Sequence, residues 1–137
     1  MKVFIDTGAF IALFVSSEQY HQKVSKKYKD YRKQRAQLFT SYYILDELFT
    51  RLIYDFGKSV TQKAMELLNK SIEKEELVVL DIDELIFKKA QEVLIKFSDH
   101  KISFTDATTY VLYKDFSLDE IFTLVGDFKR VRVTTSF

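Results

Sequence analysis

Several carboxylates stand where a protein could use them for chemistry, and they are spread along the chain. Asp6 and Asp127 each follow a short apolar run that predicts a buried strand. In a parallel sheet, ligands bind outside the carboxyl ends of the strands, so polar residues after a strand are the first candidates for a site. A carboxylate placed there can bind a hard cation. Each aspartate also has a purely structural interpretation, because Asp6 can cap the next helix and Asp127 can be a turn residue.

Two further acids, Asp106 and Glu47, lie on predicted helices. Ser103 and Asp106 have the spacing of a capping box, which is the structural alternative to a ligand role for Asp106. Glu47 lies roughly 150° around its helix from the centre of the apolar stripe, on a face shared with Tyr43. That face predicts either the lining of a cleft or subunit interface, or an exposed acid beside tyrosines. Asp46 is the competing carboxylate on the same helix.

Several other chemistries are excluded by what the sequence lacks. Cysteine is absent, which excludes disulfides, cysteine zinc sites and thiol nucleophiles. The two histidines, His21 and His100, are isolated, and no Ser/His/Asp arrangement can be built around them. Neither a dinucleotide-binding nor a P-loop glycine motif is present.

A basic stretch between positions 23 and 35 is interleaved with Tyr28 and Tyr31. Basic and aromatic side chains together suit the phosphate backbone and bases of a nucleic acid, although a solvated helix face is the simpler alternative. The candidate RNA-binding residues are Lys23, Lys26, Lys27, Arg32, Lys33 and Arg35.

Length and composition predict one globular domain over residues 1–137. The chain has 47% hydrophobic and 30% charged residues, no proline and only 3 glycines, which favours short loops and much helix. No apolar run approaches the ~18 residues that span a bilayer, and no signal-peptide core is found. We therefore expect no membrane partner and a cytoplasmic location.

The hydrophobic pattern predicts strands that alternate with helices. Strands are expected at 2–5, 38–40, 77–80, 121–125 and 131–134, and helices at 9–15, 18–35, 41–56, 59–74, 85–97 and 105–114. Ser41 is the expected N-cap of the helix at 41–56, and Gly57 its expected stop. This order predicts an α/β fold, a three-layer α/β/α sandwich with a central parallel sheet.

Four segments together resemble the PIN domain family, and most closely its VapC-type toxin ribonucleases. They are VFIDT at 3–7, ILDEL at 44–48, SFTDA at 103–107 and TLVGDF at 123–128. The resemblance implies a Mg²⁺- or Mn²⁺-dependent endoribonuclease in which water attacks phosphorus, leaving 5′-phosphate and 3′-hydroxyl ends. Carboxylate oxygens suit these ions, and no protein nucleophile is needed.

The resemblance also implies roles for particular residues. The catalytic acids are Asp6, Glu47, Asp106 and Asp127, of which Asp6, Asp106 and Asp127 are the metal ligands, and Thr7 and Thr105 support them. The chain departs from the family pattern at Val125, where many members carry an acid.

The implied partners are an RNA substrate, a VapB-like protein antitoxin and a second copy of the chain in a homodimer. An arginine of the antitoxin would pair with the same carboxylates that hold the metal. Two alternatives stay open: a PIN nuclease of ribosomal RNA maturation or RNA decay, and a degenerate PIN fold that binds RNA or protein without cutting.

Overall fold

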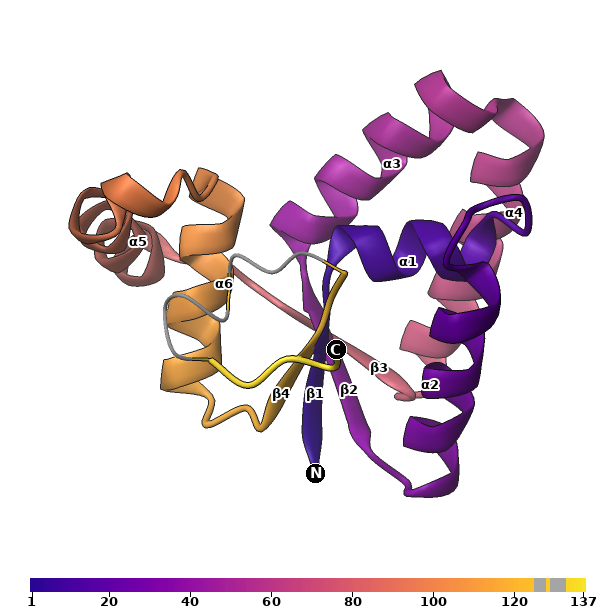
Figure 1. Ribbon diagram of the computed structural model, residues 1–137, viewed down its shortest axis with the longest axis horizontal. Coiled ribbons are helices and arrows are strands. Elements are labelled where there is room, and N and C mark those ends of the chain that lie inside the picture. Colours follow the sequence, from indigo (N-terminus) through magenta and orange to yellow (C-terminus); the bar gives the residue numbers. More distant parts are fainter. Residues whose placement is uncertain (125–127, 129–132) are drawn as a thin grey trace.

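A sheet of parallel strands lies at the centre of the computed structural model, which describes residues 1–124, 128 and 133–137. The strand order is β3-β2-β1-β4 (Figure 1). The strands are β1 (Lys2–Ile5), β2 (Gln37–Ser41), β3 (Leu77–Leu80) and β4 (Glu120–Phe122).

Helices cover both faces of this sheet. α5 and α6 pack together on one side, α1, α2 and α4 lie on the other, and α3 extends from the end of β2 (Figure 1). The helices are α1 (Thr7–Phe14), α2 (His21–Lys33), α3 (Tyr42–Phe56), α4 (Lys58–Glu73), α5 (Glu84–Lys96) and α6 (Phe104–Asp115), with a short 3₁₀ turn, η1 (Ser98–His100). The predicted α/β/α sandwich with a parallel sheet is confirmed.

Local signals set the helix ends. The Ser41 hydroxyl accepts a hydrogen bond from the Ile44 N–H over 3.2 Å at the start of α3, as predicted. Asp83 caps α5 in the same way, through the Ile86 N–H at 2.9 Å. Gly57 ends α3 with a φ of 94°, a conformation that other residues adopt only with strain.

The last part of the chain differs from the expectation. β4 ends at Phe122, earlier than the strand expected over 121–125, and Val125 and Asp127 lie outside the described residues. Of the strand expected over 131–134, residues 131–132 also lie outside them, and the residues described there are not in a strand. Instead, Thr135 makes an isolated parallel bridge with Ile121.

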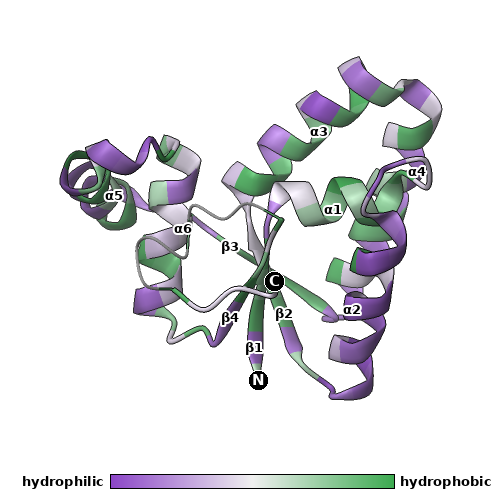
Figure 2. Ribbon diagram, viewed as in Figure 1, coloured by the Kyte–Doolittle hydropathy of each residue, from purple (hydrophilic) through white to green (hydrophobic). Residues whose placement is uncertain are grey.

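Burial on both faces of the sheet explains the apolar run that follows Lys2 in β1. β1 lies inside the sheet between β2 and β4, and Val3, Phe4 and Ile5 are fully buried because helices cover both faces. Apolar residues dominate the strands, whereas α2 is largely hydrophilic (Figure 2). Within the described part of the chain, no helix has the length and apolar character needed to cross a membrane.

The strand register determines which residues meet at the carboxyl edge of the sheet. Ile5 pairs with Phe122, and the Asp6 N–H donates to the Phe122 carbonyl over 3.0 Å. The next residue of each strand, Asp6 and Thr123, therefore lies at the same point of this edge. The parallel pairing of β1 with β4 in this register thus brings together residues that are far apart in sequence.

Candidate acidic site

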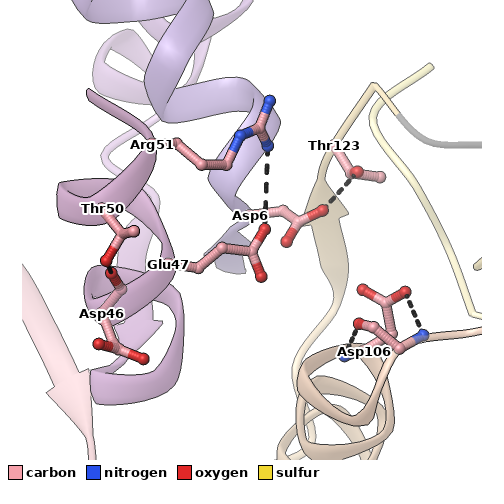
Figure 3. Close-up of polar contacts among 8 residues, drawn as sticks. Asp6, Asp46, Glu47, Thr50, Arg51, Asp106 and Thr123 are labelled. Atoms are coloured by element: carbon pink, nitrogen blue, oxygen red, sulfur yellow. Dashed lines mark hydrogen bonds and ion pairs between the residues drawn. The ribbon is translucent and has the colours of Figure 1, made fainter. Parts of the chain in front are cut away.

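Asp6 is the buried centre of the site. It is 5% exposed and sits directly between β1 and α1. It occupies the N-cap position of α1, but its side chain makes no capping hydrogen bond. Its carboxylate Oδ2 instead accepts a hydrogen bond from the Thr123 hydroxyl over 2.8 Å (Figure 3). The capping interpretation therefore accounts for the position of Asp6 but not for the contacts of its carboxylate.

The pKa of Asp6 reflects the burial of its carboxylate and the groups that surround it. It is raised from 3.8 to about 6, chiefly because burial removes water from the charged form. The hydrogen bonds from the Thr123 hydroxyl and the Thr7 N–H lower the pKa, whereas the negative charges of Asp106 and Glu47 raise it. Two acids that are distant in sequence thus act on Asp6, so three of the predicted catalytic carboxylates lie in one neighbourhood.

Asp106 enters this neighbourhood from the first turn of α6. The predicted capping box is present: the Ser103 hydroxyl accepts from the Asp106 N–H at 3.0 Å, and Asp106 Oδ2 accepts from the Ser103 N–H at 3.1 Å. The Asp106 carboxylate lies on the side of α6 that faces Asp6 (Figure 3). The structural and the functional interpretation of Asp106 are therefore compatible, because one side chain can do both.

Glu47 approaches the site from the opposite side, on α3. Its side chain is 40% exposed and points toward Asp6, and its Oε1 lies 3.8 Å from an Arg51 guanidinium nitrogen (Figure 3). Asp46 is exposed and points away from Asp6. Of the two adjacent carboxylates on α3, Glu47 is thus the one that belongs to the site.

The predicted supporting threonines differ in their surroundings. Thr7 is 2% exposed, and within the described residues its hydroxyl has no hydrogen-bond partner. Thr105 is half-buried, and its carbonyl accepts from the Thr108 hydroxyl at 2.6 Å. The predicted acid Asp127 lies outside the described residues.

Two residues of the site were missed by the sequence reasoning. Thr123 was recognised only as part of a motif, and nothing in the sequence indicated that its hydroxyl would contact Asp6. Arg51 is not among the predicted site residues, although its spacing of four residues from Glu47 on one helix is a usable signal for an ion pair.

The predicted basic residues of α2 fall into two groups. Lys23 and Lys27 lie over the rings of Phe137 and Tyr31, at 4.2 and 5.1 Å, and Arg32 lies 3.6 Å from Glu76. Lys26, Lys33 and Arg35 are exposed. Since β2 begins just after Arg35, the end of α2 lies at the amino edge of the sheet, opposite Asp6. Tyr31 is buried and donates a hydrogen bond to Glu120, so it is not available to stack on a base.

The donor set fits a hard divalent cation. Within residues 1–124, 128 and 133–137, no group of three or more acidic or histidine side chains is close enough to form a complete metal site. Mg²⁺ and Mn²⁺, however, keep several waters and need only one or two carboxylates from the protein. Asp6 and Asp106 supply these, and the buried Thr7 hydroxyl has no hydrogen-bond partner among the described residues. A cation would offset the burial and the repulsion that raise the pKa of Asp6.

Comparisons with known proteins identify the family and the fold of the chain. The sequence model of the family described as PIN domain matches residues 3–133. No curated protein sequence matches the chain. The structure is similar to VapC20 of Mycobacterium tuberculosis, a sarcin–ricin loop cleaving toxin, with a TM-score of 0.80 and 20% identity over 96% of each chain.

Two other solved structures are similar over nearly their whole length. One is VapBC2 from Rickettsia felis bound to a DNA fragment from their promoter, with a TM-score of 0.75, 13% identity, and coverage of 99% of this chain and 98% of that chain. The other is FitAcB from Neisseria gonorrhoeae, with a TM-score of 0.70, 17% identity, and coverage of 97% and 95%. At such identities these matches show the fold.

Proposed function

This chain belongs to the PIN domain family, and from that premise we propose that it is a metal-dependent endoribonuclease of the VapC type. The observation that carries the proposal is the carboxylate of Asp6, buried at the carboxyl edge of the sheet and acted on by the charges of Asp106 and Glu47. An acid whose pKa is raised by burial, and further by neighbouring acids, is typical of a functional site.

The acids take different parts in the proposed reaction. Asp6 and Asp106 would hold Mg²⁺ or Mn²⁺, with Asp127 as an outer ligand. The chemistry that such an ion would supply is polarisation of the scissile phosphate and a lowered pKa of water. Glu47 lies at the more solvent-exposed side of the site, and it orients the water that attacks phosphorus in line. Thr7 and Thr105 support the ligands, and Arg51 holds the Glu47 carboxylate in place.

RNA is the proposed substrate, and its backbone requires positive charge. The exposed residues Lys26, Lys33 and Arg35 are available for phosphate contacts beyond the cut site. Lys23, Lys27 and Arg32 already have partners within the chain, so their contribution to RNA binding is expected to be smaller.

An RNA cleavage assay with added Mn²⁺ tests the proposal. The variants Asp6→Asn and Asp106→Asn should each lose roughly 10²-fold or more in cleavage rate, since each removes a charged ligand without changing its shape. Asp46→Asn is the matched control, because it removes a carboxylate next to Glu47 that points away from the site. Equal cleavage by the wild type and the two ligand variants would contradict the assignment.

We further propose a protein antitoxin, VapB-like, as the partner. A mostly apolar pocket of about 280 Å³ lies between α1, α2, α4 and the sheet, where Leu13, Phe14 and Leu67 line it. An apolar segment of the antitoxin would bury these side chains, and an arginine from it would pair with Asp6 and Asp106. Expression of the chain alone should arrest growth, and co-expression of the antitoxin should relieve the arrest. A chain carrying Asp6→Asn should not arrest growth.

We also propose that two copies of the chain form a homodimer in the cytoplasm. Large apolar side chains are exposed on two helices, Ile53 and Tyr54 on α3 and Leu85 and Ile95 on α5. Such surfaces favour association. Light scattering of the purified chain checks this, with a mass near 32 kDa expected for two copies of a 16.2 kDa chain.

A further inference from the structure

The end of the chain returns to the sheet beside the acidic site. The Ile121 N–H donates to the Thr134 carbonyl at 2.8 Å, and the Ser136 N–H donates to the Ile121 carbonyl at 2.9 Å. Residues 134–137, which we call the C-terminal tail (yellow in Figure 1), therefore pair with β4 at Ile121. The Phe137 ring packs near Phe122, with centroids 6.3 Å apart, and anchors the end of this tail in place.

The hydroxyl of Ser136 binds the backbone of one residue twice. It accepts from the Thr123 N–H at 3.1 Å and donates to the Thr123 carbonyl at 3.1 Å. Thr123 lies immediately beyond the end of β4. The Ser136 side chain thus replaces strand pairing at this residue and holds its peptide groups from both sides.

Thr123 is in turn the residue that contacts Asp6. Its hydroxyl donates to Asp6 Oδ2 at 2.8 Å, and both side chains are buried. The direction of a threonine hydroxyl depends on its backbone, because a branched side chain has few rotamers. A polar chain therefore runs from Ser136 through Thr123 to the Asp6 carboxylate.

We propose that Ser136 is a positioning residue that fixes Thr123 and, through it, the carboxylate of Asp6. This inference rests on the proposed function, because it gives the C-terminal tail the role of positioning a carboxylate that is proposed to bind the metal. Mutation of a residue that hydrogen-bonds to a metal ligand typically lowers metal affinity or activity by about 10–100-fold. Ser136 is one step further away, so about 3- to 10-fold is expected.

The test compares Ser136→Ala with Ser136→Thr, which keeps the hydroxyl, and with Thr135→Val. Thr135 is the matched control, because its hydroxyl belongs to the same tail and donates only to the Phe137 carbonyl, at 2.9 Å. Calorimetry with Mn²⁺ should show about 3- to 10-fold weaker binding for Ser136→Ala, with kcat reduced by a similar factor and KM for RNA unchanged. Ser136→Thr and Thr135→Val should resemble the wild type.

A measurement independent of activity separates this inference from the proposed function. At a fixed pH and without metal, Ser136→Ala should change the carboxyl ¹³C chemical shift of Asp6 and speed exchange of the Thr123 amide, whereas Thr135→Val should change neither. A wild type that neither binds Mn²⁺ nor cleaves RNA would overturn the proposed function. Unaltered Asp6 and Thr123 signals in a folded Ser136→Ala protein, or wild-type Mn²⁺ affinity in it, would overturn the role of Ser136.

Discussion

The hydroxyl of Thr123 donates a hydrogen bond to Asp6 over 2.8 Å, although the two residues are 117 positions apart in the chain. The parallel pairing of β1 with β4 makes them neighbours. Because both side chains are buried, water does not compete for this bond. Burial favours the neutral form of Asp6, and the bond from Thr123 is the strongest of the contacts that favour its charged form.

Thr123→Val removes this donor with almost no change in shape. The pKa of Asp6 should rise above its value of about 6, since the contact that lowers it most is lost. Carbon-13 NMR of the Asp6 carboxyl group over a pH titration measures the change. Thr50→Val is the control, because the Thr50 hydroxyl donates only to the Asp46 carbonyl on α3. An unchanged pKa in Thr123→Val would show that the bond does not stabilise the carboxylate.

Asp6 should destabilise the metal-free protein at neutral pH. Its pKa is 3.8 in the unfolded chain and about 6 in the folded protein, so the folded protein binds more protons between these values. The contribution of Asp6 to stability is thus complete below about pH 4 and lost as the pH rises through about 6. The total loss is roughly 3 kcal/mol as an upper figure.

Asp6→Asn isolates this effect. Without divalent ions, the variant should be more stable than the wild type at neutral pH, and the two should converge in acid. Urea unfolding at several pH values measures both. A variant that is less stable than the wild type at neutral pH would show that the Asp6 charge is compensated within the protein.

A bound cation should reverse this destabilisation. Millimolar Mn²⁺ should raise the melting temperature of the wild type by several degrees at neutral pH, because a ligand that binds only the folded state stabilises it. The increase should fade below about pH 6, where Asp6 is protonated. Asp106→Asn should show a smaller increase, and Asp46→Asn should behave like the wild type.

Glu47 and Asp46 make a natural pair for mutation. Glu47→Gln should lower kcat by roughly 10- to 10²-fold if this carboxylate orients the attacking water, with little effect on stability because the side chain is part-exposed. Asp46→Asn should leave kcat within about two-fold of the wild type. RNA cleavage under single-turnover conditions measures both rates. Equal losses in the two variants would point to a general charge effect of α3.

Much of this fold could be predicted because the relevant signals are local. Ser41, Asp83 and Ser103 each cap the helix that follows them, and β1 and β3 contain short apolar runs. The parallel order implies that residues after the strands, such as Asp6, share one edge. α6 leads into β4 and so runs back across the sheet, which places its first turn, with Asp106, at that same edge.

The contacts within the site could not be predicted in the same way. They depend on the register of β1 against β4 and on the route of the tail, which the sequence alone does not determine. Thr123 contacts Asp6 only because Ile5 pairs with Phe122. Tyr31 looked like a base-stacking residue beside lysines, but tertiary packing buries it against Glu120.

The capping box of α6 allows stability and activity to be separated. Ser103→Ala removes the acceptor for the Asp106 N–H and should cost about 1 kcal/mol of stability. It should also lower RNA cleavage several-fold, because the first turn of α6, which carries the Asp106 carboxylate, is held less firmly, although the Ser103 N–H still donates to Asp106 Oδ2. Asp83→Ala removes an equivalent cap from α5, which follows β3 at the opposite end of the sheet from β4. It should cost a similar amount of stability and leave cleavage unchanged. Urea unfolding and cleavage rates measured on both variants check this, and an equal loss of activity in the two would mean that the cap acts only through stability.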